Sequence, residues 1–576
     1  MELGPKPALH AARWRAAAAA PLLLSMLLLA GCGGGSAANA TPSFEDPPEV
    51  AFGERLFLET RFAQFYASHS PDSVNAPLAS GDPAVATLPN AGGPALGGPF
   101  AGQSINCRQC HLVDEQIATP GAGARTYADF ARRSVITERG DGPALTTRNS
   151  PPLVNATVPR AAALILHADG EFTNVAELAR ATLTGRNTGW LPGEEAQAIA
   201  HIARVIREDD GTDALAADAG GSYRAVLSGT SASLKLPAAY RLDVNTASDA
   251  EIVDRVAMLI GVYVDQLRFV TNAAGVSVNA PYDLFLARNG LPATPAFGES
   301  DLDYARRLRG AVEALTAPQF VAANVLRRFQ FHPQAFAFTE AELRGLRVFL
   351  REPADPLAGP SADELAAGGI GNCVSCHAPP QFSDFGLHNT GVSQLEYDGL
   401  HGAGAFAALA IPNLAERADP AIADRTLPAT AAHPARRGQF RAIAAADAPG
   451  RSDLGAWSIF ANGDFPGSQA ALRSLLCNIA LPARDCATAS NDALLADAVA
   501  SFKTPGLRDL GDSQPYLHDG SRDSLETTMA FYAESAALAR AGQLRNGDPR
   551  LAGIVINAAD QADLAAFLRA LNEDYN

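Results

Sequence analysis

The residues best suited to chemistry lie in two short strings of the 576-residue chain, each with two cysteines followed by a histidine. The strings are Cys107-Arg108-Gln109-Cys110-His111 and Cys373-Val374-Ser375-Cys376-His377. Two thiols at this spacing can form thioether bonds with the vinyl groups of a haem, and the adjacent histidine can then bind the iron. A redox dithiol or half of a zinc site would leave the histidine after each string unexplained. We therefore expect two covalently bound c-type haems.

Three further cysteines complete the seven in the chain. Cys477 and Cys486 have no histidine or third cysteine beside them, so the pattern favours a disulfide over a metal site. Two free thiols are the alternative.

The first residues have the pattern of an export signal. Basic residues precede an apolar run that is too short to span a bilayer, and the run ends at Leu29-Ala30-Gly31-Cys32. This ending resembles the lipobox of bacterial lipoproteins, and a plain secretory signal is the alternative. We expect Cys32 to be acylated, which would anchor the protein to the periplasmic side of a bacterial membrane, with the outer membrane preferred.

The composition is that of a folded, acidic protein. Apolar residues make up 47% of the chain, and 62 acidic against 45 basic residues give a net charge of -17. This charge repels a phosphate backbone, so we do not expect nucleic acid as a partner. The chain is longer than the roughly 250–300 residues that a single hydrophobic core supports.

Helical periodicity is clear along the chain, whereas sustained strand alternation is scarce. The two haem strings begin 266 positions apart (373 - 107), which favours two domains in series. We expect an all-α protein with two cytochrome c-like haem domains in tandem, long irregular loops and insertions. The expected divisions are a signal peptide at 1–31, a flexible tether at 32–52, a first haem domain at 53–345 and a second haem domain at 346–576.

Several longer motifs resemble those of the bacterial di-haem cytochrome c peroxidase/MauG superfamily. They are Arg148 to Asn155, His167 to Phe172, Ala280 to Phe285, Phe502 to Arg508, Pro515 to Gly520 and Leu525 to Tyr532. The resemblance implies a division of labour between a first haem, whose open face binds peroxide, and a six-coordinate second haem that passes electrons to it. Two metal centres suit an enzyme that collects two electrons from one-electron donors.

The resemblance also implies a sixth ligand for the second haem. In the superfamily this ligand lies fourteen positions after the histidine of the Pro515–Gly520 stretch, which is Tyr532 here (518 + 14). A phenolate would make this haem low-potential, because a hard oxygen ligand favours oxidised iron. Met529 is the alternative ligand, and a further alternative is that both residues only pack in the core.

The first haem departs from the superfamily pattern. Leu166 and Ala176 stand where the superfamily has a distal glutamine and glutamate for acid–base chemistry. Candidate replacements are His167, Glu171 and Glu177. Glu177 would alternatively cap a helix that begins after Asn174, and His167 would alternatively face solvent or a haem propionate.

Other sites are implied by the resemblance alone. Backbone carbonyls of Ser513 and Pro515 would contribute to one calcium site between the domains. The cations Arg148, Lys503 and Arg508 would bind haem propionates, or would alternatively be solvated. No tryptophan stands between Arg148 and Ala156, where several members place one between the haems.

The expected function is that of a di-haem oxidoreductase that reduces hydrogen peroxide. Its electron donor would be a small c-type cytochrome or a cupredoxin. One alternative is a MauG-like or rubber-oxygenase-like oxidase that acts on an organic or protein substrate. The other is a non-enzymatic electron-transfer cytochrome, which would gain nothing from an open iron.

Overall fold

The computed structural model describes residues 46–70, 72–86, 104–111, 134–212, 216, 219–323, 334–355 and 359–573. The expected signal peptide and Cys32 lie outside the described residues. The described part is mostly helical, and its single named sheet has two strands of two residues each, so the prediction of a mainly helical protein is confirmed. Across these ranges, no helix has the length and apolar character needed to span a bilayer.

The first hydrophobic core is built on α1 (Pro48–Phe57), α4 (Val175–Leu183) and α8 (Asp249–Gln266). Gly53 lets α1 cross α8 closely, because a Cβ at this position would lie 2.3 Å from the Leu259 carbonyl oxygen. The other elements of this region are α2 (Gln64–His69), α3 (Pro83–Ala86), η1 (Cys107–Gln109), η2 (Arg186–Thr188), α5 (Glu195–Glu208), α7 (Tyr223–Ser228) and η3 (Ala238–Tyr240).

The second core repeats this arrangement with α11 (Glu340–Leu350), α18 (Leu525–Arg540) and α19 (Ala558–Arg569). Gly345 has the role of Gly53, since a Cβ on it would lie 2.0 Å from the Asp563 carbonyl oxygen. The other elements of this region are α9 (Pro281–Arg288), α10 (Asp301–Glu313), α12 (Ala362–Leu365), η4 (Cys373–Ser375), η7 (Leu510–Asp512) and η8 (Pro549–Gly553).

The two cores divide between Leu267 and Tyr282 rather than at residue 345. The expected boundary at 345/346 falls inside α11, and residues on both sides of it pack in the second core. The reason is that α9 and α10, which precede α11 in the chain, bury Phe285 and Leu308 against that core.

A third core forms between β1 (Leu387–His388) and β2 (Phe502–Lys503), which pair antiparallel with His388 opposite Phe502. We call residues 389–501 the inserted module. Its core surrounds the buried Trp457, and the module contains a disulfide between Cys477 and Cys486. Its elements are α13 (Val392–His401), α14 (Leu414–Arg417), α15 (Pro420–Thr426), η5 (Ala456–Ser458), η6 (Pro466–Ser468), α16 (Gln469–Leu476) and α17 (Asn491–Asp497).

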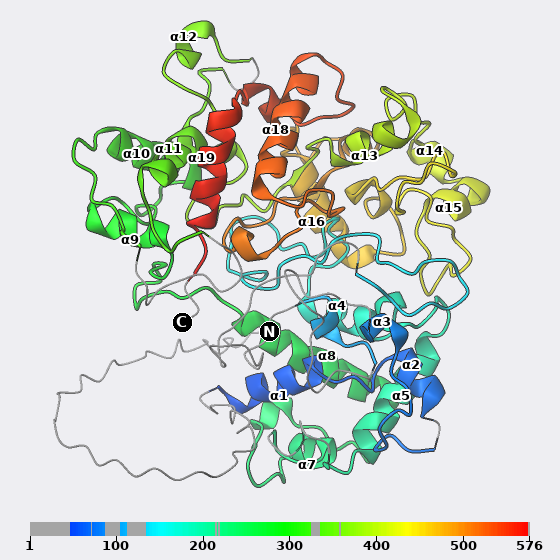
Figure 1. The fold of residues 1–576 in the computed structure, drawn as a ribbon. Helices are drawn as coiled ribbons and strands as arrows, with labels where there is room; N and C mark the ends of the chain where they lie inside the picture. The colour runs from blue at the N-terminus through cyan, green and yellow to red at the C-terminus, as the bar shows by residue number, and fades with distance from the viewer. Residues whose placement is uncertain are drawn as a thin grey trace, which may run out of the picture.

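The three cores lie beside one another (Figure 1). In this view the helices α1, α5, α7 and α8 occupy the lower half, while α11, α18 and α19 occupy the upper left. The helices α13 to α16 of the inserted module lie at the upper right. The inserted module contacts the first part of the chain, because Arg441 pairs with Glu171 and Asp453 pairs with Arg148, although the chain reaches the module only after α11.

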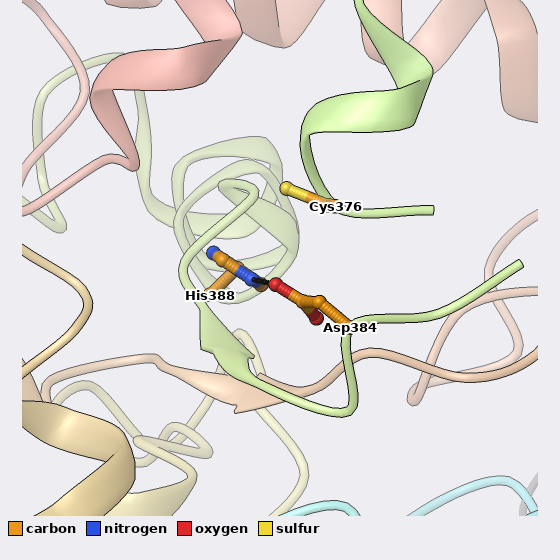
Figure 2. A group of neighbouring side chains, drawn as sticks. All are labelled: Cys376, Asp384 and His388. Atoms are coloured by element: carbon orange, nitrogen blue, oxygen red, sulfur yellow. Dashed lines mark hydrogen bonds and ion pairs between the residues drawn. The ribbon is translucent and has the colours of Figure 1, made fainter. Parts of the chain in front are cut away.

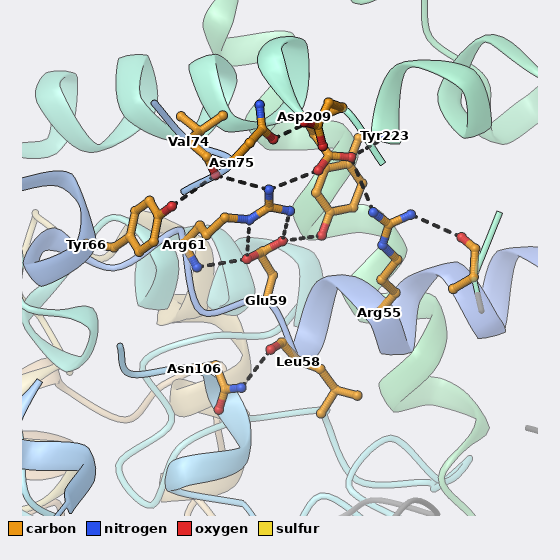
Figure 3. Close-up of polar contacts among 12 residues, drawn as sticks. Arg55, Leu58, Glu59, Arg61, Tyr66, Val74, Asn75, Asn106, Asp209 and Tyr223 are labelled. Carbon is orange, nitrogen blue, oxygen red and sulfur yellow. Dashed lines mark hydrogen bonds and ion pairs between the residues drawn. The ribbon is translucent and has the colours of Figure 1, made fainter. Parts of the chain in front are cut away.

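A buried ionic network holds the end of α1 in the first core (Figure 3). Arg61 donates to Glu59 at 2.9 Å and to Asp209 at 2.9 Å, and Arg55 pairs with the same Asp209 at 3.3 Å. Removing one member of such a network would leave an unpaired buried charge, which is strongly destabilising. The network fixes the segment whose Leu58 carbonyl accepts a 2.7 Å hydrogen bond from the side chain just before Cys107.

Candidate functional site

Both cysteine–histidine strings fold into the same short 3-10 turn. Each turn is closed by a hydrogen bond from the histidine amide to the first cysteine carbonyl, at 3.0 Å for His111 and 2.7 Å for His377. The four cysteines of the two strings form no disulfide. Their thiols are therefore available for attachment to haem.

A cavity of about 320 Å³ opens beside the second string. Cys373, Cys376 and His377 line it together with mostly apolar side chains, which suits a porphyrin. His377 Nδ1 donates to the Phe382 carbonyl at 2.8 Å, so Nε2 keeps its lone pair for a metal. The donor set and the cavity fit the expected second haem.

Both candidates for the sixth ligand line this cavity. Tyr532 and Met529 lie on α18, three residues apart, and Met529 is buried. Burial raises the pKa of the Tyr532 phenol, so an iron cation would be needed to hold it as phenolate. Because both residues line the cavity, the preference for Tyr532 stays a prediction.

The first half of the chain carries a copy of the turn that precedes α18. Leu166 pairs with Phe172, and Tyr516 pairs with Arg522, as isolated antiparallel bridges 350 positions apart. In each turn, the residue after the first bridge partner has a positive φ, which is 61° for His167 and 71° for Leu517. The turns also share an aspartate that accepts from the amide two residues on. The two segments are structural equivalents.

The same shift of 350 positions aligns α4 with α18. Asn174 and Ser524 are the N-cap residues of these helices, and each accepts from backbone amides of the first turn. Met529 and Tyr532 therefore correspond to Ala179 (529 - 350) and Thr182 (532 - 350). A methyl group and a threonine hydroxyl replace the two candidate iron ligands.

Two backbone hydrogen bonds join the halves reciprocally. The Asn149 amide donates to the His518 carbonyl at 2.6 Å, and the Lys503 amide donates to the Ala168 carbonyl at 2.7 Å. Ala168 and His518 are again 350 positions apart, so each half binds the equivalent turn of the other. This exchange fixes the two candidate haem regions relative to each other.

His167 and Glu171, two of the expected acid–base residues, contact each other. His167 Nδ1 donates to Glu171 Oε2 at 2.9 Å, and both side chains are largely buried. Burial alone would raise the pKa of Glu171, but Arg441 and the histidine hold that pKa below its ordinary value. The pair is therefore an ionised carboxylate that orients an imidazole.

Arg441 belongs to the inserted module and was not expected from the sequence. Its guanidinium pairs with Glu171 and lies 3.0 Å from Asp169, which in turn pairs with Arg148 at 2.6 Å. Two guanidinium groups thus neutralise carboxylates that, with His167, could otherwise have held a metal ion. No local pattern could have shown this, because Arg441 and Glu171 are 270 positions apart.

Glu177, the third acid–base candidate, lies apart from this pair. It is exposed near the start of α4, and its backbone amide donates to the Asn174 side chain at 3.2 Å. The structure thus brings together His167 and Glu171 but not Glu177.

The three expected propionate partners differ in their surroundings. Arg148 is held by Asp169 and Asp453, and Arg508 makes two bonds to Asp283 at 2.9 and 3.1 Å. These two guanidinium groups are already matched by carboxylates.

Lys503 lines the second cavity, and in the described ranges no carboxylate pairs with it. Burial lowers the pKa of Lys503 to about 8. Arg160 lines the same cavity, stacks 3.8 Å from the Phe385 ring centroid and was missed from the sequence. These two cations fit propionates best.

The side chain of Asn149 lies in the expected calcium region, in addition to Ser513 and Pro515. Asn149 Nδ2 donates to the Pro515 carbonyl at 2.6 Å, while the buried Asn149 Oδ1 has no hydrogen-bond partner within the described residues. Carbonyl and amide oxygens are ligands that calcium prefers. The donor set fits a calcium ion.

Comparisons with known proteins give one short sequence match. The chain is 36% identical over 76 residues to the cytochrome-c peroxidase IdrP2 of Pseudomonas sp. (strain SCT). This match covers 13% of the chain and 18% of that relative. No family model matches the sequence.

Two solved structures align over most of the chain. The diheme peroxidase BthA of Burkholderia thailandensis E264 is 17% identical, with 92% of this chain and 86% of that chain covered and a TM-score of 0.40. A MauG-like protein associated with microbial copper homeostasis is also 17% identical, with 93% and 95% covered and a TM-score of 0.41. The sequence match to a cytochrome-c peroxidase agrees with the di-haem cytochrome c peroxidase/MauG superfamily that the motifs predicted.

Proposed function

We propose that this protein is a di-haem oxidoreductase that reduces hydrogen peroxide at the first haem with electrons passed on by the second. The observation that carries this proposal is the contrast between α4 and α18. The second helix directs Tyr532 and Met529 at its cavity, whereas the first has Thr182 and Ala179 at the equivalent positions. Only the first iron would keep a free coordination position for peroxide.

The haems, held by the two cysteine–histidine strings, would supply the iron chemistry and store the electrons. The overall change is H₂O₂ + 2 e⁻ + 2 H⁺ → 2 H₂O. His167 has the means to move protons, because its Nδ1 is committed to Glu171 and its Nε2 remains to accept a proton from peroxide and return it to the leaving oxygen. Arg441 keeps Glu171 ionised, so the imidazole stays oriented.

The electrons would enter from a small c-type cytochrome or a cupredoxin. A net charge of -17 favours a partner with a basic docking surface through long-range attraction. We place this reaction on the periplasmic side of a bacterial membrane, with Cys32 as a lipid anchor. Cys32→Ala should release soluble protein or leave the precursor uncleaved, and unchanged fractionation with normal processing would contradict the anchor.

A second candidate function is that of a MauG-like oxidase acting on an organic or protein substrate. Tyr532 at the second cavity favours it, because a phenolate ligand stabilises oxidised iron. A carrier without catalysis is the least favoured function, since it has no use for the asymmetry between α4 and α18. We also propose one calcium ion bound by carbonyls of Ser513 and Pro515, with Asn149 as a side-chain ligand.

Stopped-flow spectroscopy of the diferric and half-reduced holoprotein with peroxide tests the proposal. We expect a rapid spectral change at the first haem, slowed about 100-fold or more in His167→Ala, as for a lost acid–base group. Glu177→Gln is the matched control, because it removes an exposed carboxylate from the same region. No reaction of either redox form with peroxide would overturn the proposal.

A further inference from the structure

His388 lies in the wall of the second cavity, where the peroxide reaction proposed above makes no use of it. The residue belongs to β1 and is 8% exposed. Its Nδ1 lies 2.5 Å from an Asp548 oxygen, and its Nε2 lies 2.8 Å from an Asp384 oxygen. Figure 2 shows the imidazole beside Asp384, with the Cys376 sulfur above it.

The two contacts fix the protonation of this imidazole. Ionised carboxylates only accept hydrogen bonds, so each ring nitrogen must carry a hydrogen, and the ring is a cation. Although burial opposes the charge, the carboxylates hold the pKa of His388 well above its ordinary value. Burial likewise opposes ionisation of Asp384, and His388 holds the pKa of that carboxyl at about 2.

These contacts exclude a metal site at the same place. Cys376, Asp384 and His388 are close enough to share an ion. However, an imidazolium has no lone pair for a metal, and the Cys376 sulfur is needed for the thioether bond to haem. The cluster therefore acts through its charge.

Four charged groups make up the cluster. Arg550 Nη1 donates to the two oxygens of Asp548 at 3.2 and 3.0 Å, so two cations face two carboxylates. His388, Asp548 and Arg550 all line the cavity, whereas Asp384 is the most exposed member, with 36% of its side chain exposed. The cluster is neutral only while His388 is charged.

We propose that His388 is a positioning residue that sets the redox potential of the second haem through a fixed positive charge. The proposal rests on the proposed binding of haem at Cys373, Cys376 and His377. Reduction of the iron removes one positive charge from the centre, so a nearby buried cation stabilises the reduced state and raises the potential. Without the His388 charge, the carboxylates of the cluster would add to the lowering that a Tyr532 phenolate causes.

The test is a charge series read by optical redox titration of the holoprotein. His388→Gln leaves the cluster one unit more negative and should lower the midpoint potential of one haem. Asp384→Asn makes it one unit more positive and should raise the same potential. In the double variant the net charge is restored, and the potential should return towards that of the wild type. A purely structural role would not produce opposite signs and their cancellation.

His433→Gln is the matched control, because His433 also pairs with a carboxylate, Asp464, but lies in the inserted module away from the cavity. It should leave both potentials unchanged. A fully loaded His388→Gln protein with an unchanged or raised potential would overturn the proposal.

Haem content is measured separately, as the pyridine haemochrome. If His388→Gln fails to bind haem, the potential of the Asp384→Asn protein becomes the test. A potential that is unchanged or lowered in Asp384→Asn contradicts the proposal. Loss of peroxide reactivity with intact haems and the expected shifts would count against the proposed function and not against the role of His388.

Discussion

The turn and helix around Ala179 and those around Met529 have the same geometry but different side chains at two equivalent helix positions. Both turns have a bridge pair, a residue with positive φ and an aspartate that accepts a backbone amide, and both helices begin at an N-cap side chain. The difference lies in two helix positions. The backbone scaffold is therefore separable from the side chains that it presents, and under the proposed function the chain would use one scaffold for a closed and for an open iron.

The surroundings of the two regions differ as well. Arg441 of the inserted module pairs with Asp169 and Glu171 of the first turn. Asp453 of the same module pairs with Arg148, which also binds Asp169. The second cavity instead has its own cluster around His388. The two proposed acid–base residues thus depend on the inserted module, whereas the second cavity has a neutral cluster of charged side chains from its own surroundings.

The largest expected effect is the loss of one haem from one half. Cys107→Ala and Cys373→Ala should each remove about half of the covalently bound haem, because each breaks one of the two equivalent attachment sites. Haem staining after denaturing electrophoresis and acid–acetone extraction measure this. Release of both haems from the wild type by extraction would contradict covalent attachment at the two strings.

Transplanting the ligand should convert the open site into a closed one. Thr182→Tyr places a phenol where α18 has Tyr532. It should slow the reaction with peroxide at least about tenfold, which corresponds to an increase of roughly 1.4 kcal/mol in the activation free energy. The first haem should also become low-spin. Ala181→Tyr is the control, because Ala181 is exposed on the same helix. Equal rates of reaction with peroxide in the two variants would contradict the equivalence of Thr182 and Tyr532.

The converse change concerns the closed site. Tyr532→Phe should alter the ferric spectrum of the second haem and raise its potential, because an anionic oxygen ligand is lost. Met529→Leu should leave the spectrum nearly unchanged. A thioether band in the wild type that disappears only in Met529→Leu would assign Met529 instead.

Local patterns predicted much of this site. The cysteine–histidine strings and the helical fold follow from residues that are close in sequence, whereas His167 and Tyr532 were chosen because their motifs resemble those of the superfamily. Residues 418–451, by contrast, have the composition of a loop, and nothing near Arg441 indicates its partner 270 positions away. The position of the domain boundary could not be predicted for the same reason, because only their contacts show that α9 and α10 belong to the second core.

Arg441 also gives a stability prediction. Arg441→Met should destabilise the protein by about 3 kcal/mol, because it leaves Asp169 and Glu171 with less compensation for burial. The thermal transition of the holoprotein should fall by roughly 5 °C. Arg451→Met, at an exposed position of the same module, is the control. An equal change in both variants would show that the contact contributes little.

A pH dependence of stability is expected from Glu573, which is 1% exposed and accepts from the Val270 amide at 2.9 Å in the segment between the first two cores. Burial and the nearby Asp509 raise the pKa of Glu573 above its ordinary range. At neutral pH the folded state therefore keeps a proton that the unfolded state has lost.

Stability must then fall as pH rises from the ordinary glutamate pKa, near 4.3, towards the raised one, with a slope of at most about 1.4 kcal/mol per pH unit. Glu573→Gln mimics the protonated acid in both states, so it should flatten the decline of the melting temperature between about pH 5 and 8. Glu534→Gln, an exposed change on α18, should leave the decline intact. Parallel curves for the wild type and Glu573→Gln would mean that Glu573 is ionised when folded, and that the link between the first two cores contains a buried negative charge stabilised by Arg508.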